Sequence, residues 1–267
     1  LSEVVGITFI IIAGIIATLA VHAKTSAVPA IVPYISSDNI ILAQAAYDAI
    51  GRIGGKYAHS AVVEGKVIDA LSDHRERAVL DTADSIDQEL VKYYFETSAN
   101  SSLQIQAFKK LYALDAPQAE KSFKNVFSQS SSYKRQALIR TAMELDVKYQ
   151  EEFVQTFSNL SIADKLTVLG AISELGLSEY ESNLISLLPE SRGEIHNQII
   201  YALASIGGEA SFQTLYQAFQ EDDDNPAITY AITQLELPIV DKYLLGVVSG
   251  QSTSDVSERI AAIRPLV

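Results

Sequence analysis

The chain has 267 residues, a formal net charge of −13 and no cysteine. Without cysteine it has no disulfide, no thiolate nucleophile and no cysteine-based metal site. We expect no nucleic-acid partner, because phosphate binding requires clustered lysine and arginine, and this chain has only 20 such residues against 33 acidic ones.

The first feature along the chain is an uncharged apolar run from Val4 to Val21. Eighteen residues in a helix span about 27 Å, close to the thickness of a bilayer core. Three interpretations are open. The run is a single transmembrane anchor, a secretory signal peptide cut after Val21-His22-Ala23, or a segment kept in a mature chain that was cut just before Leu1. The third interpretation accounts for a first residue that is not methionine.

The residues Leu1-Ser2-Glu3-Val4-Val5-Gly6, followed by an Ile/Ala-rich helix, resemble the mature N-terminus of archaeal type IV pilins and their archaellin relatives. The resemblance covers about residues 1–23. It implies processing before Leu1, a stay in the membrane before assembly, and a filament whose core is built from packed N-terminal helices. The chain beyond the helix departs from the family, whose heads are usually β-rich.

Particular residues of this expected helix suit packing between copies. Glu3 lies in the first turn, where a carboxylate favours the positive end of the helix dipole, and in a staggered bundle it would pair with a neighbour's α-amino group. Small residues allow apolar helices to approach closely. The predicted helix-packing interface consists of Gly6, Ala13, Gly14, Ala17 and Ala20. The alternative is that alanine and glycine are simply common in membrane helices.

After this helix the chain becomes proline-containing and then repetitive. Pro29 and Pro33 predict that a helix over residues 1–28 ends near Ala27 or Val28 and is followed by a linker over residues 29–37. Equivalent aliphatic residues then recur at Ile53, Leu114, Leu145, Leu175, Ile206, Leu235 and Ile263. Their separations of 61, 31, 30, 31, 29 and 28 residues indicate a period near 30, with one degenerate copy around residues 72–98.

A period of this length fits two short helices and two turns, and the pattern resembles the short HEAT-like repeats that also occur in bilin lyases. The predicted fold class is all-α, with a long N-terminal hydrophobic helix followed by a HEAT-like α-α superhelix of seven to eight two-helix repeats over residues 38–267. Helix starts are predicted at Ser101, Ser161, Ser191 and Asn225-Pro226, each a capping signal. Gly54-Gly55 and Gly207-Gly208 are predicted helix ends.

The sequence predicts no catalytic residue, no metal site and no cofactor. The four histidines are scattered, and the acidic run at residues 221–224 is typical of a solvated loop rather than a cation site. Two glycosylation sequons begin at Asn100 and Asn159. Each asparagine is a candidate glycan site if the chain lies outside the cell, although asparagine before a helix also suits simple capping.

We therefore expect a structural protein rather than an enzyme. The leading hypothesis is a subunit of an extracellular type IV pilus-like filament at the cell surface. Its chief partner would be itself, through residues 1–28, and the solenoid would be exposed for adhesion or subunit contacts. The alternative is a single-pass membrane-anchored scaffold whose solenoid binds other proteins in a complex. A bilin-lyase-like enzyme is the third hypothesis.

Overall fold

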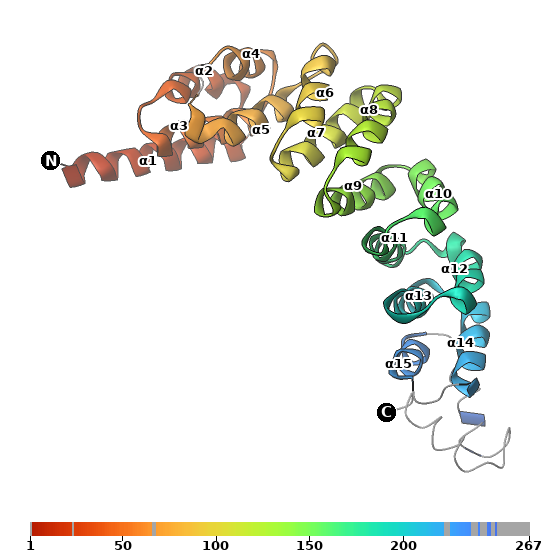
Figure 1. The fold of residues 1–267 in the computed structure, drawn as a ribbon. Helices are drawn as coiled ribbons and strands as arrows, with labels where there is room; N and C mark the ends of the chain where they lie inside the picture. The colour runs from red at the N-terminus through yellow and green to blue at the C-terminus, as the bar shows by residue number, and fades with distance from the viewer. Residues whose placement is uncertain are drawn as a thin grey trace. The chain divides into compact units, whose positions relative to one another are not determined.

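The structure is a computed structural model that describes residues 2–22, 24–65, 68–221, 225–235, 240, 245–246 and 249; for residues 2–5 and 221 it describes the backbone alone. Within these residues all regular secondary structure is helical, which confirms the all-α class (Figure 1). The chain divides into two compact units, residues 1–137 and 138–267. The division falls inside α9 (Ser132–Leu145).

Unit 1 starts with one long helix and continues as helical pairs. Its α-helices are α1 (Ser2–Val21), α2 (Val28–Ile31), α3 (Ile40–Ile53), α4 (Lys56–Glu64), α5 (Ser72–Thr82), α6 (Gln88–Thr97), α7 (Ser101–Leu114) and α8 (Ala116–Gln129). Short 3₁₀ turns cover Thr25–Ala27, Val32–Ser36 and Asp69–Leu71. Helix α1 packs on α3, and α3 in turn packs on α5.

Unit 2 repeats a long helix followed by a shorter or more interrupted one. Its α-helices after α9 are α10 (Val147–Gln155), α11 (Ile162–Leu175), α12 (Glu181–Leu187), α13 (Gly193–Ile206), α14 (Glu209–Glu221) and α15 (Pro226–Gln234). Further 3₁₀ turns cover Phe157–Asn159, Ser178–Tyr180 and Leu188–Glu190. Helices α11, α13 and α15 pack side by side in that order.

The helix ends follow the period read from the sequence. Helices α3, α7, α9, α11 and α13 end at the residues predicted to be equivalent, which are Ile53, Leu114, Leu145, Leu175 and Ile206. The degenerate copy is present as the pair α5 and α6. Each long helix contributes fully buried aliphatic residues spaced three or four apart, such as Ile199 and Leu203 of α13, so one stripe faces the core.

The predicted long N-terminal hydrophobic helix over residues 1–28 is wrong. Helix α1 ends at Val21, well before the prolines, and one of its faces belongs to the core of unit 1, where Ile16 and Ala20 are buried and α1 packs on α3. No helix in the described part of the chain is long and apolar enough to cross a membrane. The physical reason for the packing is that it removes apolar side chains of α1, including Ile16 and Ala20, from water.

The proline-containing stretch is folded onto the same unit. Pro29 and Pro33 stand in the first turn of α2 and of the 3₁₀ turn Val32–Ser36, where a missing N–H costs nothing. Val28, Ile31 and Ile35 are buried, so these residues pack as part of unit 1. Residues 222–224 of the acidic run, Pro238 and the last expected repeat position at Ile263 lie outside the described residues.

Candidate functional site

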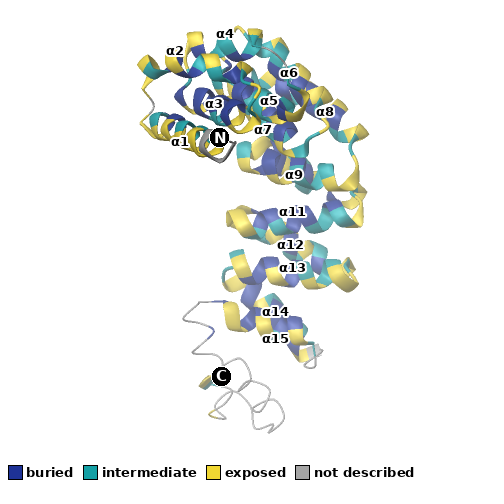
Figure 2. Cartoon of the chain, turned by 90° about the vertical axis from the view of Figure 1, so that its left-hand side faces the viewer, coloured by how far each residue is buried: buried dark blue, intermediate teal, exposed yellow. Residues whose placement is uncertain are grey.

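Helix α1 has one buried face and one exposed apolar face. Ile16 and Ala20 are buried, whereas four isoleucines on the other side of the helix are exposed. Much of α1 is coloured as exposed in Figure 2. These four, named here the isoleucine ridge, are Ile7, Ile10, Ile11 and Ile15. Ile10 is 63% exposed. A contiguous apolar surface of this kind on a helix is typical of an interaction site rather than of scattered exposure.

A groove of about 390 Å³ runs beside the ridge, between α1 and α3. Small residues of α1 form one wall, and α3 forms the other with Ile41, Ala45 and Ala49 together with the polar side chains of Gln44, Asp48 and Arg52. The α1 wall consists of Ala13, Gly14, Ala17 and Ala20. At 100° per residue this wall is centred about a quarter turn from the ridge. One helix therefore carries a projecting apolar surface and a recessed one side by side.

The structure places most of the predicted packing residues at this groove. A Cβ added to Gly14 would meet no atom within 4 Å, and the same is true of Gly6, so both positions open to the surroundings. Gly6 does not line the groove. Leu1 and the side chain of Glu3 lie outside the described residues. Sequence reasoning found the small-residue wall but missed α3 as its partner within the chain.

The two sequon asparagines differ in their surroundings. The Asn100 side chain caps α7, where its Oδ1 accepts hydrogen bonds from the backbone N–H groups of Ser102 and Leu103 at 2.9 and 3.3 Å. Its Nδ2 donates to Asp73 Oδ2 at 2.7 Å. Asn159 ends a 3₁₀ turn and its side chain is exposed.

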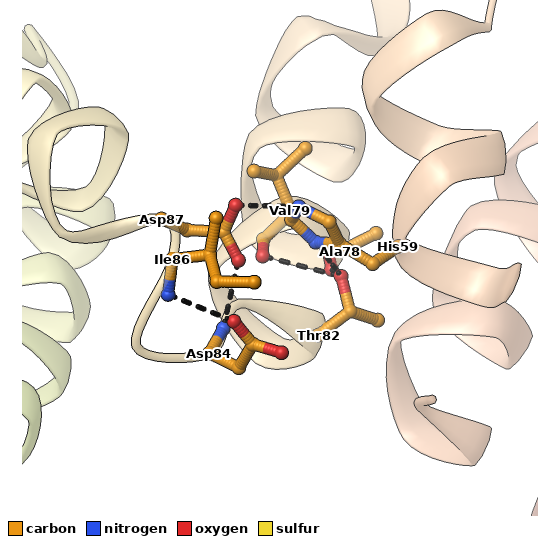
Figure 3. A network of polar contacts seen from close by, with 7 residues as sticks. All are labelled: His59, Ala78, Val79, Thr82, Asp84, Ile86 and Asp87. Atoms are coloured by element: carbon orange, nitrogen blue, oxygen red, sulfur yellow. Dashed lines mark hydrogen bonds and ion pairs between the residues drawn. The ribbon is translucent and has the colours of Figure 1, made fainter. Parts of the chain in front are cut away.

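A cluster of hydrogen-bonded polar groups in unit 1 surrounds His59 of α4 (Figure 3). His59 Nδ1 lies 2.9 Å from Thr82 Oγ1, and His59 Nε2 lies 3.0 Å from Asp87 Oδ1. Asp87 Oδ2 also accepts a hydrogen bond from the Asp84 backbone N–H at 2.8 Å, and Asp84 Oδ1 accepts one from the Ile86 N–H. The cluster borders a pocket of about 410 Å³.

A hydroxyl, an imidazole and a carboxylate in line are the groups of a hydrolase triad, in which the hydroxyl must give its proton to the imidazole. The Thr82 hydroxyl donates back to its own helix, with Oγ1 2.8 Å from the Ala78 carbonyl oxygen and 3.2 Å from that of Val79. Its proton is thereby committed to the backbone. The hydrogen bonds of this cluster therefore have a structural role, because they join α4 to α5 and to the turn at residues 84–87.

A second hollow lies in unit 2, where Tyr201 of α13 and Tyr230 of α15 are exposed next to each other. These tyrosines were not predicted from the sequence, because the repeats indicate core positions and the tyrosines are exposed. Read at the same register, the repeats would have shown that both tyrosines stand five residues before an equivalent helix-end position, Ile206 and Leu235.

No known protein family matches the chain, and no curated protein matches it either. The candidate surfaces are therefore interpreted from their own geometry.

Proposed function

We propose that the protein is a structural subunit that polymerises at the cell surface into a type IV pilus-like filament, with α1 as the contact between copies. The observation that carries the proposal is the pairing of the isoleucine ridge with the small-residue groove on one helix. The pilin-like residues at the start of the sequence point in the same direction.

The two surfaces complement each other in shape. Side-chain ridges of one helix pack into the grooves of another, and small residues at the groove let the two backbones approach. The ridge supplies large aliphatic side chains, and the groove supplies alanine and glycine walls. Fully burying an isoleucine contributes about 1.5–3 kcal/mol, so covering the exposed parts of these four side chains supplies a favourable term for association.

The two surfaces also differ, which determines the kind of assembly. When the ridge of one copy enters the groove of the next, every interior copy uses both surfaces. The assembly keeps an unused ridge at one end and an unused groove at the other. Such a head-to-tail contact builds rings if the rotation closes and open helical filaments if it does not. A filament subunit needs this type of contact.

The first prediction concerns single substitutions on α1. Ile11→Glu places a charge on the ridge, and Gly14→Leu fills the groove without a clash within the chain, because the space around Gly14 is open. We expect each change to weaken association by about 100-fold, since burying an unpaired carboxylate or losing the groove costs about 3 kcal/mol. Sedimentation of the full chain, combined with negative-stain microscopy, measures the loss.

Ile86→Glu is the matched control, because Ile86 is 84% exposed on the turn at residues 84–87 and touches neither surface. We expect filaments from the original chain and from this control, and single folded chains from the two α1 variants. A chain that stays monomeric at all concentrations contradicts the proposal. Discrete particles that remain in the membrane fraction would instead support a membrane-anchored scaffold.

A further inference from the structure

The hollow of unit 2 that contains Tyr201 and Tyr230 is a groove of about 670 Å³ formed along α11, α13 and α15. Two tyrosines, two glutamines and two serines line it, together with Ala204. None of these side chains carries a charge, although the chain as a whole has a net charge of −13. The groove is therefore neutral, polar and aromatic.

The repeat register explains how the groove arises. The ninth residue of each 14-residue helix α9, α11 and α13 is Arg140, Gly170 and Tyr201, and Tyr230 holds the corresponding place in α15. Equivalent places of neighbouring helices lie close together, since a Cβ added to Gly170 would lie 3.8 Å from Arg140 Nη2 and the Tyr201 and Tyr230 rings are 5.8 Å apart. The repeat therefore brings the two tyrosines together in the groove.

The two tyrosine rings form a corner. Their planes meet at 83°, in an edge-to-face arrangement, and the side chains are 39% and 54% exposed. The negative face of an aromatic ring attracts partly positive hydrogens, including those on carbon. Two rings at nearly a right angle thus provide a rigid corner against which a flat-sided, C–H-rich group can pack.

Groups that both donate and accept hydrogen bonds surround this corner. Gln198 and Gln234 present side-chain amides, and the Gln234 amide uses one N–H toward Thr233 Oγ1 at 3.3 Å. The hydroxyls of Ser173 and Ser205 donate to the carbonyl oxygens of Leu169 and Ser173, and their oxygens retain accepting capacity toward the groove.

We propose that this groove binds a neutral carbohydrate chain. Each sugar hydroxyl both donates and accepts, which suits glutamine and serine, and the C–H face of a sugar ring suits the tyrosine corner. An ionised ligand would lose hydration without gaining a countercharge. A proline-rich peptide would offer carbonyl acceptors but no proline N–H, which would leave the serine and glutamine oxygens unmatched. The proposal is independent of assembly through α1, since it involves other helices.

The test is calorimetric titration of the full chain with cellohexaose, maltohexaose and mannohexaose, and with a decaproline peptide. We expect at least one hexasaccharide to bind and the peptide not to bind. Tyr201→Ala and Tyr230→Ala should each weaken binding by about tenfold or more, because each removes one ring of the corner. Tyr201→Phe should retain most of the affinity.

Tyr133→Ala is the control, because Tyr133 is 74% exposed and does not line the groove. Circular dichroism of each variant reports whether the helices are retained. Three results would overturn the proposal: no hexasaccharide binds, a hexasaccharide binds equally well to the Tyr201→Ala and Tyr230→Ala variants, or the decaproline peptide binds in place of the sugars.

Discussion

At the scale of single residues, the two sequon asparagines are not equivalent targets for modification. Glycosylation attaches a sugar to the side-chain nitrogen, and in Asn100 this atom donates to Asp73 Oδ2 while the oxygen caps α7. Asn159 is exposed at the end of a turn. When the folded chain meets a glycosylating enzyme, the exposed amide is the accessible one.

We therefore predict glycan occupancy at Asn159 and little at Asn100 when the chain passes through a glycosylating secretion route. Mass spectrometry of the two tryptic peptides measures both occupancies. The Asp73→Ala variant is the internal check, because it releases the Asn100 nitrogen without altering the sequon, and it should raise occupancy at Asn100. Equal occupancy at the two sites in the original chain would show that the hydrogen bonds offer no protection.

Glu181 joins one helical pair to the next through three hydrogen bonds. Its Oε1 accepts from the backbone N–H groups of Gly208 and Ser211 at 2.7 and 3.0 Å and from the Ser211 hydroxyl at 2.7 Å, at the start of α14. Partial burial raises the pKa of Glu181, but the three hydrogen bonds outweigh it and hold the pKa below the ordinary value of 4.5. The charged form is therefore the stabilising one.

This lowered pKa predicts a specific dependence of stability on pH. The contribution of Glu181 is complete above the unfolded value of 4.5 and is lost as the pH falls through the lower folded value. Glu181→Gln should reduce the free energy of unfolding by about 1–2 kcal/mol at pH 7, and the difference should shrink as the pH falls below 4.5. Urea unfolding over a series of decreasing pH values tests this, and a difference that stays constant across the series would contradict the linkage.

At the scale of helices and turns, local signals predicted some starts and missed others. Ser161 and Asn225 cap α11 and α15 as expected, because each accepts a hydrogen bond from a backbone N–H two or three residues on. Ser101 does not cap α7, since Asn100 directly before it takes that role. Ser191 closes the preceding turn with a hydrogen bond to Leu188 O, so α13 starts at Gly193 instead.

The glycine pairs show the same division between local and tertiary causes. Gly54 ends α3 at a φ of 68° and Gly55 precedes α4 at 95°, values that favour glycine at a tight turn between helices. Gly207 ends α13 with an ordinary φ of −77°. Its need for glycine comes from contact, since an added Cβ would lie 2.2 Å from Leu203 O and Ser211 Oγ. That crowding arises where α13 turns into α14, so contact rather than backbone conformation requires the glycine.

The candidate surfaces were predictable only in part, for a related reason. The small residues of α1 are evident from their spacing, but a uniformly apolar run has no polar face to show which side is buried. Its orientation depends on α3, on which α1 packs with Ile16 and Ala20 buried. The groove that contains Tyr201 and Tyr230 is composed of residues about 30 positions apart in the sequence. It can therefore be predicted only when the repeats are aligned.

At the scale of the whole molecule, mixing two variants distinguishes a head-to-tail assembly from a closed dimer. The Ile11→Glu chain keeps its groove, and the Gly14→Leu chain keeps its ridge. If the ridge of one copy enters the groove of the next, neither variant assembles alone, and an equimolar mixture forms heterodimers that cannot grow, because every remaining surface is defective. Analytical ultracentrifugation with one variant labelled should show two-chain species and nothing longer.

The opposite arrangement predicts a different pattern. If ridges paired with ridges about a two-fold axis, the Gly14→Leu chain alone would dimerise as well as the original chain, and the original chain would stop at the dimer, because a contact of this type uses the same surface on both copies. That pattern would leave α1 as an assembly surface but would exclude it as the repeating contact of a filament. The mixing experiment therefore tests polymerisation through the complementarity of two surfaces on a single helix.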